Sequence, residues 1–239
     1  MMKVVTLSSA KGGSGKSSLT LNISGRKGLK HRVLVLDLDE QKNTTSVLRE
    51  TRDLNTIYDV LTHKVHIKDA IKPSRFKNVD YIPASAKIST LSVEKLAIKR
   101  LLQDIYNEYD FVVIDTPPSI KLTVVQSAYV ASNLVMIPTI LDKFSSANLM
   151  VLFNDIRKLN IKTEIKIVPS MMVKNSKLHN NVYDELKKFV DSKEGIELTR
   201  PLPNSIEISN QMMENKLIAN SNKVNKLKTA LKKLIDEEV

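Results

Sequence analysis

Residues 8–18 read Ser-Ser-Ala-Lys-Gly-Gly-Ser-Gly-Lys-Ser-Ser, and most of the predicted fold and chemistry follows from this segment. It follows the β-branched run at 4–7 and precedes apolar residues at helical spacing that continue to Leu29. A strand, a glycine-rich loop and a helix in this order are the context of a phosphate-binding P-loop. The alternative is a glycine-rich turn that leads into an ordinary helix.

The chemistry of the loop suits a nucleoside triphosphate. Its glycines let backbone N–H groups curl around an anion, and the helix that starts near Lys16 adds the positive end of its dipole. Lys16 can neutralise β- and γ-phosphate charge, and the Ser17 hydroxyl can ligate the Mg²⁺ that accompanies a nucleotide. The predicted nucleotide-binding residues of the loop are Lys11, Gly12, Gly13, Ser14, Gly15, Lys16, Ser17 and Ser18.

A second lysine, Lys11, stands at the start of the loop. The run Lys-Gly-Gly-Ser-Gly-Lys-Ser resembles the deviant Walker A box of the ParA/MinD superfamily of ATPases, and within it the short, Soj-like ParA proteins. This resemblance implies that Lys11 reaches across a dimer interface to the partner's nucleotide, where it would act with Lys16 and Asp39 in catalysis. The alternative is a solvated lysine beside the loop.

Composition predicts one domain over residues 1–239, with 42% hydrophobic residues to form its core. Only Met1 and Met2 precede Lys3, so we expect no amino-terminal helix-turn-helix domain. No apolar run is long enough for a membrane span, and no signal-peptide core is present, which predicts a cytoplasmic protein. The absence of cysteine excludes disulfides and the iron–sulfur relatives that share this loop.

The net charge is +11 and the pI is about 9.6, which indicates a polyanionic partner. The positive charge is spread along the chain rather than clustered, so it does not locate a binding face. A generally lysine-rich proteome would produce a similar bias.

Short apolar runs alternate with helical periodicity along the chain. Buried strands are predicted at 33–36, 79–84, 111–114, 134–137 and 165–168. Helical spacing fills the gaps, for example over 91–105 and 149–156. The predicted fold is α/β, a doubly wound and mostly parallel sheet flanked by helices, as in P-loop NTPases of the deviant Walker A type.

The second predicted strand ends in Asp37-Leu38-Asp39-Glu40-Gln41. This segment resembles the Asp-x-Asp-Pro-Gln box of ParA proteins, with Glu40 in place of the proline. The resemblance implies that Asp39 positions the attacking water and that Asp37 lies near the hydration shell of Mg²⁺. Two carboxylates one residue apart at a strand end point to the same side, so both can reach one metal–water network. The alternative is a helix cap with an acidic first turn.

The strand at 111–114 is followed by Asp115-Thr116-Pro117-Pro118, which resembles the Walker B and switch II segment of the family. Asp115 would hold Mg²⁺ through water, and the prolines would fix the chain as it leaves the strand. Further along, Pro203 and Asn204 resemble the loop that covers adenine in ParA proteins, although the arginine between them is missing. A plain surface turn is the alternative for that loop.

The last predicted helix, about 222–235, has an apolar stripe and five lysines on its other positions. Three interpretations compete: a core-packing helix with a solvated lysine face, a DNA-contacting face, and a membrane-surface helix of the MinD type. The acidic residues at 236–238 and the lack of aromatic residues count against the membrane.

The resemblance as a whole implies a ParA-like ATPase for plasmid or chromosome segregation. An ATP-dependent homodimer would bind nonspecific DNA on the nucleoid, and a ParB-like partner would stimulate hydrolysis and release. A MinD-like positioning ATPase on membranes is one alternative. A ligase of the dethiobiotin-synthetase or cobyrinate type is the other.

Overall fold

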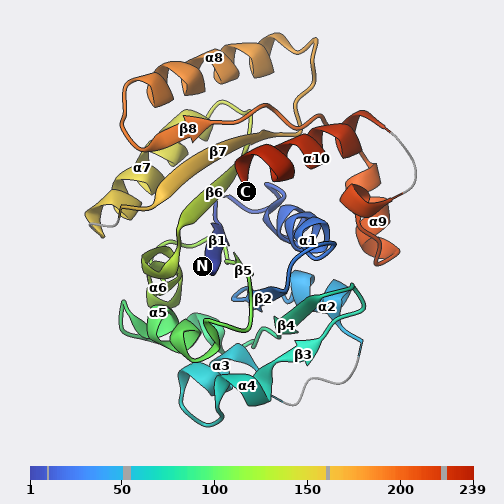
Figure 1. The fold of residues 1–239 in the computed structure, drawn as a ribbon. Coiled ribbons are helices and arrows are strands. Elements are labelled where there is room, and N and C mark those ends of the chain that lie inside the picture. Colours follow the sequence, from blue (N-terminus) through green and yellow to red (C-terminus); the bar gives the residue numbers. More distant parts are fainter. Residues whose placement is uncertain (10, 51–54, 160–161, 222–224) are drawn as a thin grey trace.

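A computed structural model describes the chain except residues 10, 51–54, 160–161 and 222–224. Its described strands form one eight-stranded sheet in the order β3-β4-β2-β5-β1-β6-β7-β8. Neighbouring strands pair in parallel, apart from the antiparallel pair β3–β4. Helices cover both faces of this sheet (Figure 1). The predicted α/β fold, doubly wound and mostly parallel, is confirmed.

Each predicted strand is present. They are β1 (Lys3–Leu7), β2 (Val33–Asp37), β4 (Val79–Ile82), β5 (Phe111–Asp115), β6 (Leu134–Ile140) and β7 (Glu164–Ser170). The two edge strands, β3 (Lys72–Pro73) and β8 (Ile196–Leu198), were not predicted. They are too short to leave an apolar run in the sequence, and short edges limit unwanted pairing with other chains.

The helices divide between the two faces. One face carries α1 (Lys16–Lys27), α2 (Asn43–Leu48), α9 (Glu207–Met213), η3 (Ile218–Asn220) and α10 (Lys226–Glu238). The other carries α3 (Ile57–Leu61), α4 (Ile67–Ala70), η1 (Ile88–Thr90), α5 (Ala97–Leu101), η2 (Leu102–Ile105), α6 (Thr123–Ala131), α7 (Ser145–Lys158) and α8 (Lys177–Asp191).

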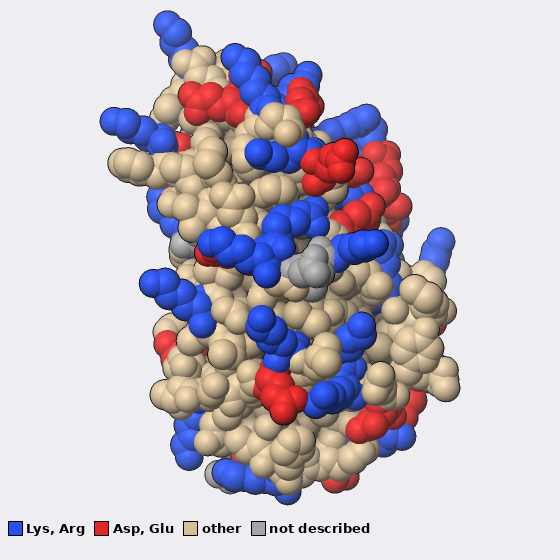
Figure 2. Space-filling model, turned by 90° about the vertical axis from the view of Figure 1, so that its left-hand side faces the viewer, with Lys and Arg blue, Asp and Glu red and all other residues tan. Residues whose placement is uncertain are grey.

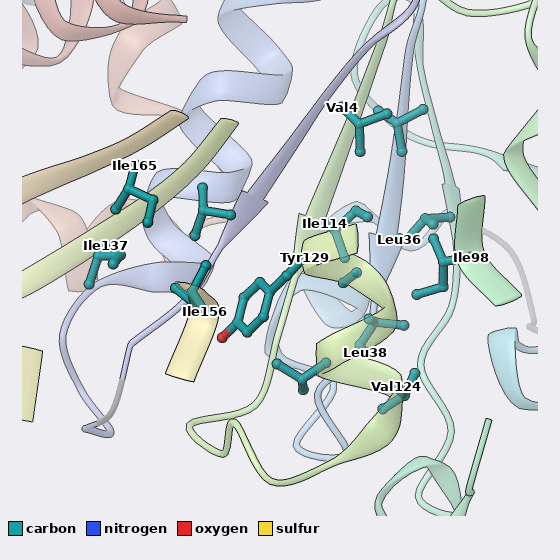
Figure 3. Packing of buried hydrophobic residues seen from close by; sticks show 14 of the residues in the cluster. Val4, Leu36, Leu38, Ile98, Ile114, Val124, Tyr129, Ile137, Ile156 and Ile165 are labelled. Carbon is teal, nitrogen blue, oxygen red and sulfur yellow. The ribbon is translucent and has the colours of Figure 1, made fainter. Parts of the chain in front are cut away.

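Both faces of the central strands are buried, because each face packs against its own helix layer. In β2, Leu34 and Leu36 face one layer, whereas Val33 and Val35 face the other. Figure 3 shows part of the first core, where side chains from neighbouring strands lie on the same side of the sheet as Tyr129 of α6. Burial on both sides explains why these strands read as continuous apolar runs rather than alternating patterns.

Two helical segments differ from their prediction. The periodicity over 91–105 extends beyond the helix, which begins only at Ala97, because the backbone N–H of Val93 donates instead to Thr123 Oγ1 at 2.9 Å. At the carboxyl end, Asp236 lies within α10 and not after it. Its carboxylate accepts two hydrogen bonds from Arg26 of α1, at 2.7 and 3.1 Å, which compensates for an acidic residue near a helix carboxyl end. The predicted positions 222–224 lie outside the described residues.

The described helices include none with the length and hydropathy needed to cross a bilayer.

The strand order places the predicted site at one edge of the sheet. Strand β5 lies between β2 and β1, so the carboxyl ends of these three strands are neighbours. The register pairs Asp115 with both Leu7 and Asp37. Ligands of open α/β sheets bind at this edge, where the strand order reverses.

Candidate functional site

The loop between β1 and α1 has the backbone of an anion-binding cradle. Gly13 and Gly15 adopt φ angles of 72° and 96°, in the left-handed region that favours glycine. Gly15 is also the N-cap of α1 and has no side chain that could cap the helix. The first N–H groups of α1 therefore remain oriented toward the loop, where an anion would accept them.

Lys16 lies inside this loop with its side chain buried. Its ammonium donates to Ser9 Oγ at 3.1 Å, and only 6% of the residue is exposed. Burial lowers the pKa of Lys16 below its usual value, and the nearby carboxylates of Asp115 and Asp39 offset this lowering only in part. A cation in this position adds positive charge where phosphate oxygens would lie, with little water to screen it.

Asp37 and Asp115 are buried side by side at the ends of β2 and β5. Burial raises the pKa of both carboxyls, and their proximity raises that of Asp37 further. The residues that begin α2 hold both groups: Thr44 Oγ1 donates to Asp115 Oδ2 at 2.6 Å, and Thr45 donates to Asp37 Oδ2 from its hydroxyl at 2.6 Å and its N–H at 2.8 Å. These hydrogen bonds hold the two carboxyl groups in place, but they do not neutralise the negative charge of the pair.

The donor set fits a magnesium ion. Within the described part of the chain, Asp115 Oδ1 is buried and has no hydrogen-bond partner. Ser17, whose hydroxyl bonds to Asp115, and Asp37 supply further oxygen atoms nearby. Among the described residues, no group of three or more His, Cys, Asp or Glu side chains is placed to hold a metal ion by itself. Such an open set of oxygens is typical of Mg²⁺, which keeps several waters and shares phosphate oxygens.

Asp39 lies in a turn between β2 and α2. Its N–H donates to Asp37 Oδ1 at 3.0 Å, and its own Oδ1 accepts the N–H of Gln41 at 3.0 Å. The turn directs Asp39 toward the loop, where it raises the pKa of Lys16. Glu40, which replaces the family's proline, accepts a hydrogen bond from Ser89 and so links the turn to η1.

Lys11 lies at the rim of the site, with 55% of its side chain exposed, and forms an ion pair with Asp142 just beyond β6. Asp142 was not among the predicted residues. It could have been predicted from its position, because Asp142 follows a predicted strand and therefore lies at the same sheet edge as Asp37 and Asp115. The Lys11 side chain lowers the pKa of Asp142, and Ser145 and Phe144 add hydrogen bonds that do the same.

The loop with Pro203 and Asn204 lies against the end of β7. The N–H of Asn204 donates to Met172 O at 3.0 Å, and Met172 N–H donates to Leu202 O at 2.9 Å. Leu202 of this loop and Ser18 of α1 line the same small cavity of about 20 Å³. The structure thus brings this loop beside the P-loop. Sequence reasoning missed other residues that line the cavity: Leu19, Asn22, Met171 and Ile208.

Comparison with known proteins identifies the family of this chain. A family model described as an AAA domain, AAA_31, matches residues 2–169. Soj of Bacillus subtilis, a sporulation initiation inhibitor protein, is 30% identical over 208 residues, which cover 81% of this chain and 82% of Soj. The chromosome-partitioning ATPase Soj of Treponema pallidum is 31% identical over 167 residues, 66% of this chain and 65% of its own.

Among solved structures, a plasmid partition protein of Borrelia burgdorferi bound to AMPPNP superposes with a TM-score of 0.85. The match covers 99% of this chain and 98% of that one, at 24% identity, and it shows the shared fold. Because the family model spans more than half of the chain and Soj aligns along most of it, the chain belongs to the AAA_31 family and, within the ParA/MinD superfamily, to the Soj-like ParA group.

Proposed function

We propose that the protein is a ParA-type partitioning ATPase, which dimerises on ATP, binds DNA nonspecifically and is released by hydrolysis. One observation carries the proposal: the same loop holds one buried lysine, Lys16, and one exposed lysine, Lys11. The first can serve the chain's own nucleotide, and the second is free of the core and can serve a partner's. The names of the Treponema and Borrelia relatives, a chromosome-partitioning ATPase and a plasmid partition protein, support a role in the partitioning of DNA.

The residues at the sheet edge have different roles in hydrolysis. Backbone N–H groups of the loop and the Lys16 ammonium bind the β- and γ-phosphates. Ser17 and Asp115, with Asp37 behind them, would hold Mg²⁺, which supplies positive charge against the phosphates. Asp39 orients a water for attack on the γ-phosphate. The catalytic set is therefore Lys16 and Asp39, completed by Lys11 of the partner subunit.

Lys11 changes partners in this cycle. In the single chain its ammonium is neutralised by Asp142. To reach a partner's phosphates, the Lys11 ammonium must leave this half-buried carboxylate for a more highly charged anion. Because an exposed ion pair contributes only about 0–1 kcal/mol, its loss is a small barrier to dimerisation.

Binding to DNA would draw on the excess of basic residues. Figure 2 shows lysines and arginines spread across one face, with smaller acidic groups between them. Three cations, Arg200, Lys226 and Lys233, line a groove of about 560 Å³ beside α10, together with the acidic Glu237 and Glu238. Lys233 Nζ lies 3.7 Å from Glu237 Oε1, so part of the lysine charge is compensated within the helix. A dimer would present this groove twice, and therefore contact more phosphates than one chain.

Binding of a nonspecific duplex tests the proposal directly. We expect binding with ATP but not with ADP, and a log–log salt dependence with a slope of about −0.9 for each phosphate neutralised. Charge reversal of Lys232 and Lys233 to glutamate should reduce the slope if α10 contacts DNA. Lys99→Glu, at an exposed position of α5 on the other face of the sheet, is the control.

Two results would contradict this model. The first is equal DNA affinity with ADP and ATP. The second is ATP-dependent binding to anionic liposomes but not to DNA, which would identify a MinD-like protein instead. A ligase would bind neither surface.

A second variant separates the two lysines. Lys11→Ala should still bind ATP as a monomer, because Lys16 is unchanged, but should lose ATP-dependent dimerisation and partner-stimulated turnover. Light scattering with and without ATP measures the first loss, and phosphate release measures the second. Lys143→Ala, at an exposed lysine near the same rim, should behave as wild type. An intact ATP-bound dimer with normal turnover would show that Lys11 is only a solvated lysine.

A further inference from the structure

We propose that Ser9 and Ser14 are positioning residues, which hold both lysines of the loop in place before nucleotide binds. The inference rests on the proposed function for its nucleotide. Neither serine is needed as a phosphate ligand in this role. Their contribution comes from a hydrogen-bond network that lies inside the loop.

The Ser9 hydroxyl is the centre of this network. It donates to the backbone carbonyl of Lys11 at 2.7 Å, and it accepts hydrogen bonds from Ser14 Oγ at 2.8 Å and from Lys16 Nζ at 3.1 Å. A serine hydroxyl has one donor and two acceptor sites, so all three are used. Ser9 and Ser14 are 5% and 2% exposed, respectively, and water therefore competes little for these bonds.

The network determines where the Lys16 ammonium lies. Burial lowers the pKa of Lys16, so its charged form needs hydrogen-bond acceptors inside the protein. Within the described ranges the Lys16 ammonium donates to Ser9 Oγ, and the bond from Ser14 orients that hydroxyl so that a lone pair faces the ammonium. An ammonium has three N–H groups, so one can stay on Ser9 while the others reach phosphate oxygens.

The same hydroxyl also anchors Lys11, through its backbone rather than its side chain. Fixing this carbonyl fixes the point from which the exposed Lys11 side chain leaves the loop. Ser9 therefore couples the position of the buried lysine to that of the exposed one. The hydrogen bond from Ser14 to Ser9 links the end of the loop that precedes α1 to the end that follows β1.

Alanine variants test the network in the full-length protein. Ser9→Ala removes the central hydroxyl, and Ser14→Ala removes only the bond that orients it. Ser24→Ala is the matched control, because Ser24 is also fully buried in α1 and loses one bond, to Thr20 O at 2.8 Å, far from the loop. Ser14→Thr keeps the hydroxyl, and small spaces of about 30 and 20 Å³ that Ser14 lines can take part of the added methyl group.

Titration with AMPPNP and Mg²⁺ is the first measurement. Ser9→Ala should weaken binding about tenfold, because it removes the hydrogen bond to the charged Lys16 ammonium. Ser14→Ala should weaken binding about threefold, because it removes only the neutral hydrogen bond between the two serines. The double variant should bind like Ser9→Ala, because Ser14 acts through Ser9. Ser14→Thr should recover the affinity that Ser14→Ala loses, because it keeps the hydroxyl, and Ser24→Ala should bind like wild type. Additive losses in the double variant, or wild-type affinity in Ser9→Ala, would overturn the proposal.

Acetylation of Lys16 by acetic anhydride, followed by peptide mass mapping, is the second measurement and needs no nucleotide. Lys16 should react several-fold faster in Ser9→Ala than in wild type or Ser24→Ala, because loss of the hydrogen bond that stabilises its ammonium leaves more of the neutral amine, which is the form that attacks the anhydride. An unchanged rate would overturn the proposal. If wild type itself fails to bind AMPPNP, the proposed function fails, while this labelling still decides the role of Ser9.

Discussion

Replacing Lys16 by alanine should abolish ATP binding and every ATP-dependent step. The Lys16 ammonium is the buried cation of the loop, and its charge-assisted bonds to two phosphates are together worth about 3–5 kcal/mol. The expected loss of affinity is therefore on the order of a hundred- to several thousandfold. Isothermal titration with ATP and Mg²⁺ measures it, with Lys30→Ala, at an exposed site just beyond α1, as the control.

Loss of folding would not explain this result. Lys16→Ala removes a desolvated charge, so the nucleotide-free variant should be at least as stable as wild type. Thermal unfolding without nucleotide checks this, and ATP should raise the unfolding temperature of wild type but not of the variant. Wild-type affinity in Lys16→Ala would remove the assignment of residues 8–18 as a P-loop.

The second large effect concerns Asp39. Asp39→Ala should still bind ATP and Mg²⁺, because Lys16, Ser17 and Asp115 remain, but hydrolysis should fall by a factor of about 10²–10⁴, because the carboxylate that orients the attacking water is lost. With hydrolysis blocked, the variant should remain as an ATP-bound dimer on DNA. The measurement is residence time on DNA with ATP, compared with the rate of phosphate release.

Two further variants isolate the cause. Asp39→Asn keeps an acceptor for the N–H of Gln41 and so preserves the turn, while it removes the carboxylate charge. It should lose turnover as Asp39→Ala does. Asp115→Ala removes the buried oxygen that fits a metal, and should lose productive nucleotide binding before hydrolysis. If Asp39→Ala leaves DNA as completely as Asp115→Ala does, Asp39 is a metal or structural residue.

Much of the fold could be predicted because its signals are local. Strands such as 33–36 are buried on both faces and therefore leave unbroken apolar runs. The glycine pattern of the loop reflects backbone angles that other residues rarely adopt, at Gly13 and Gly15. The short edge strands and the start of α5 carried no such signal, because pairing and contacts with distant residues determine them.

The P-loop pattern, the strands with their terminal aspartates and the two lysines in one motif can be predicted from the sequence, since each depends on neighbouring residues. Which of these groups meet depends on the tertiary structure. Strand β5 lies between β2 and β1, and this order brings Asp115 beside Asp37. Thr44 bonds to Asp115 across 71 positions, and Lys11 to Asp142 across 131. Contacts at such separations depend on how the sheet is wound, which no local pattern records.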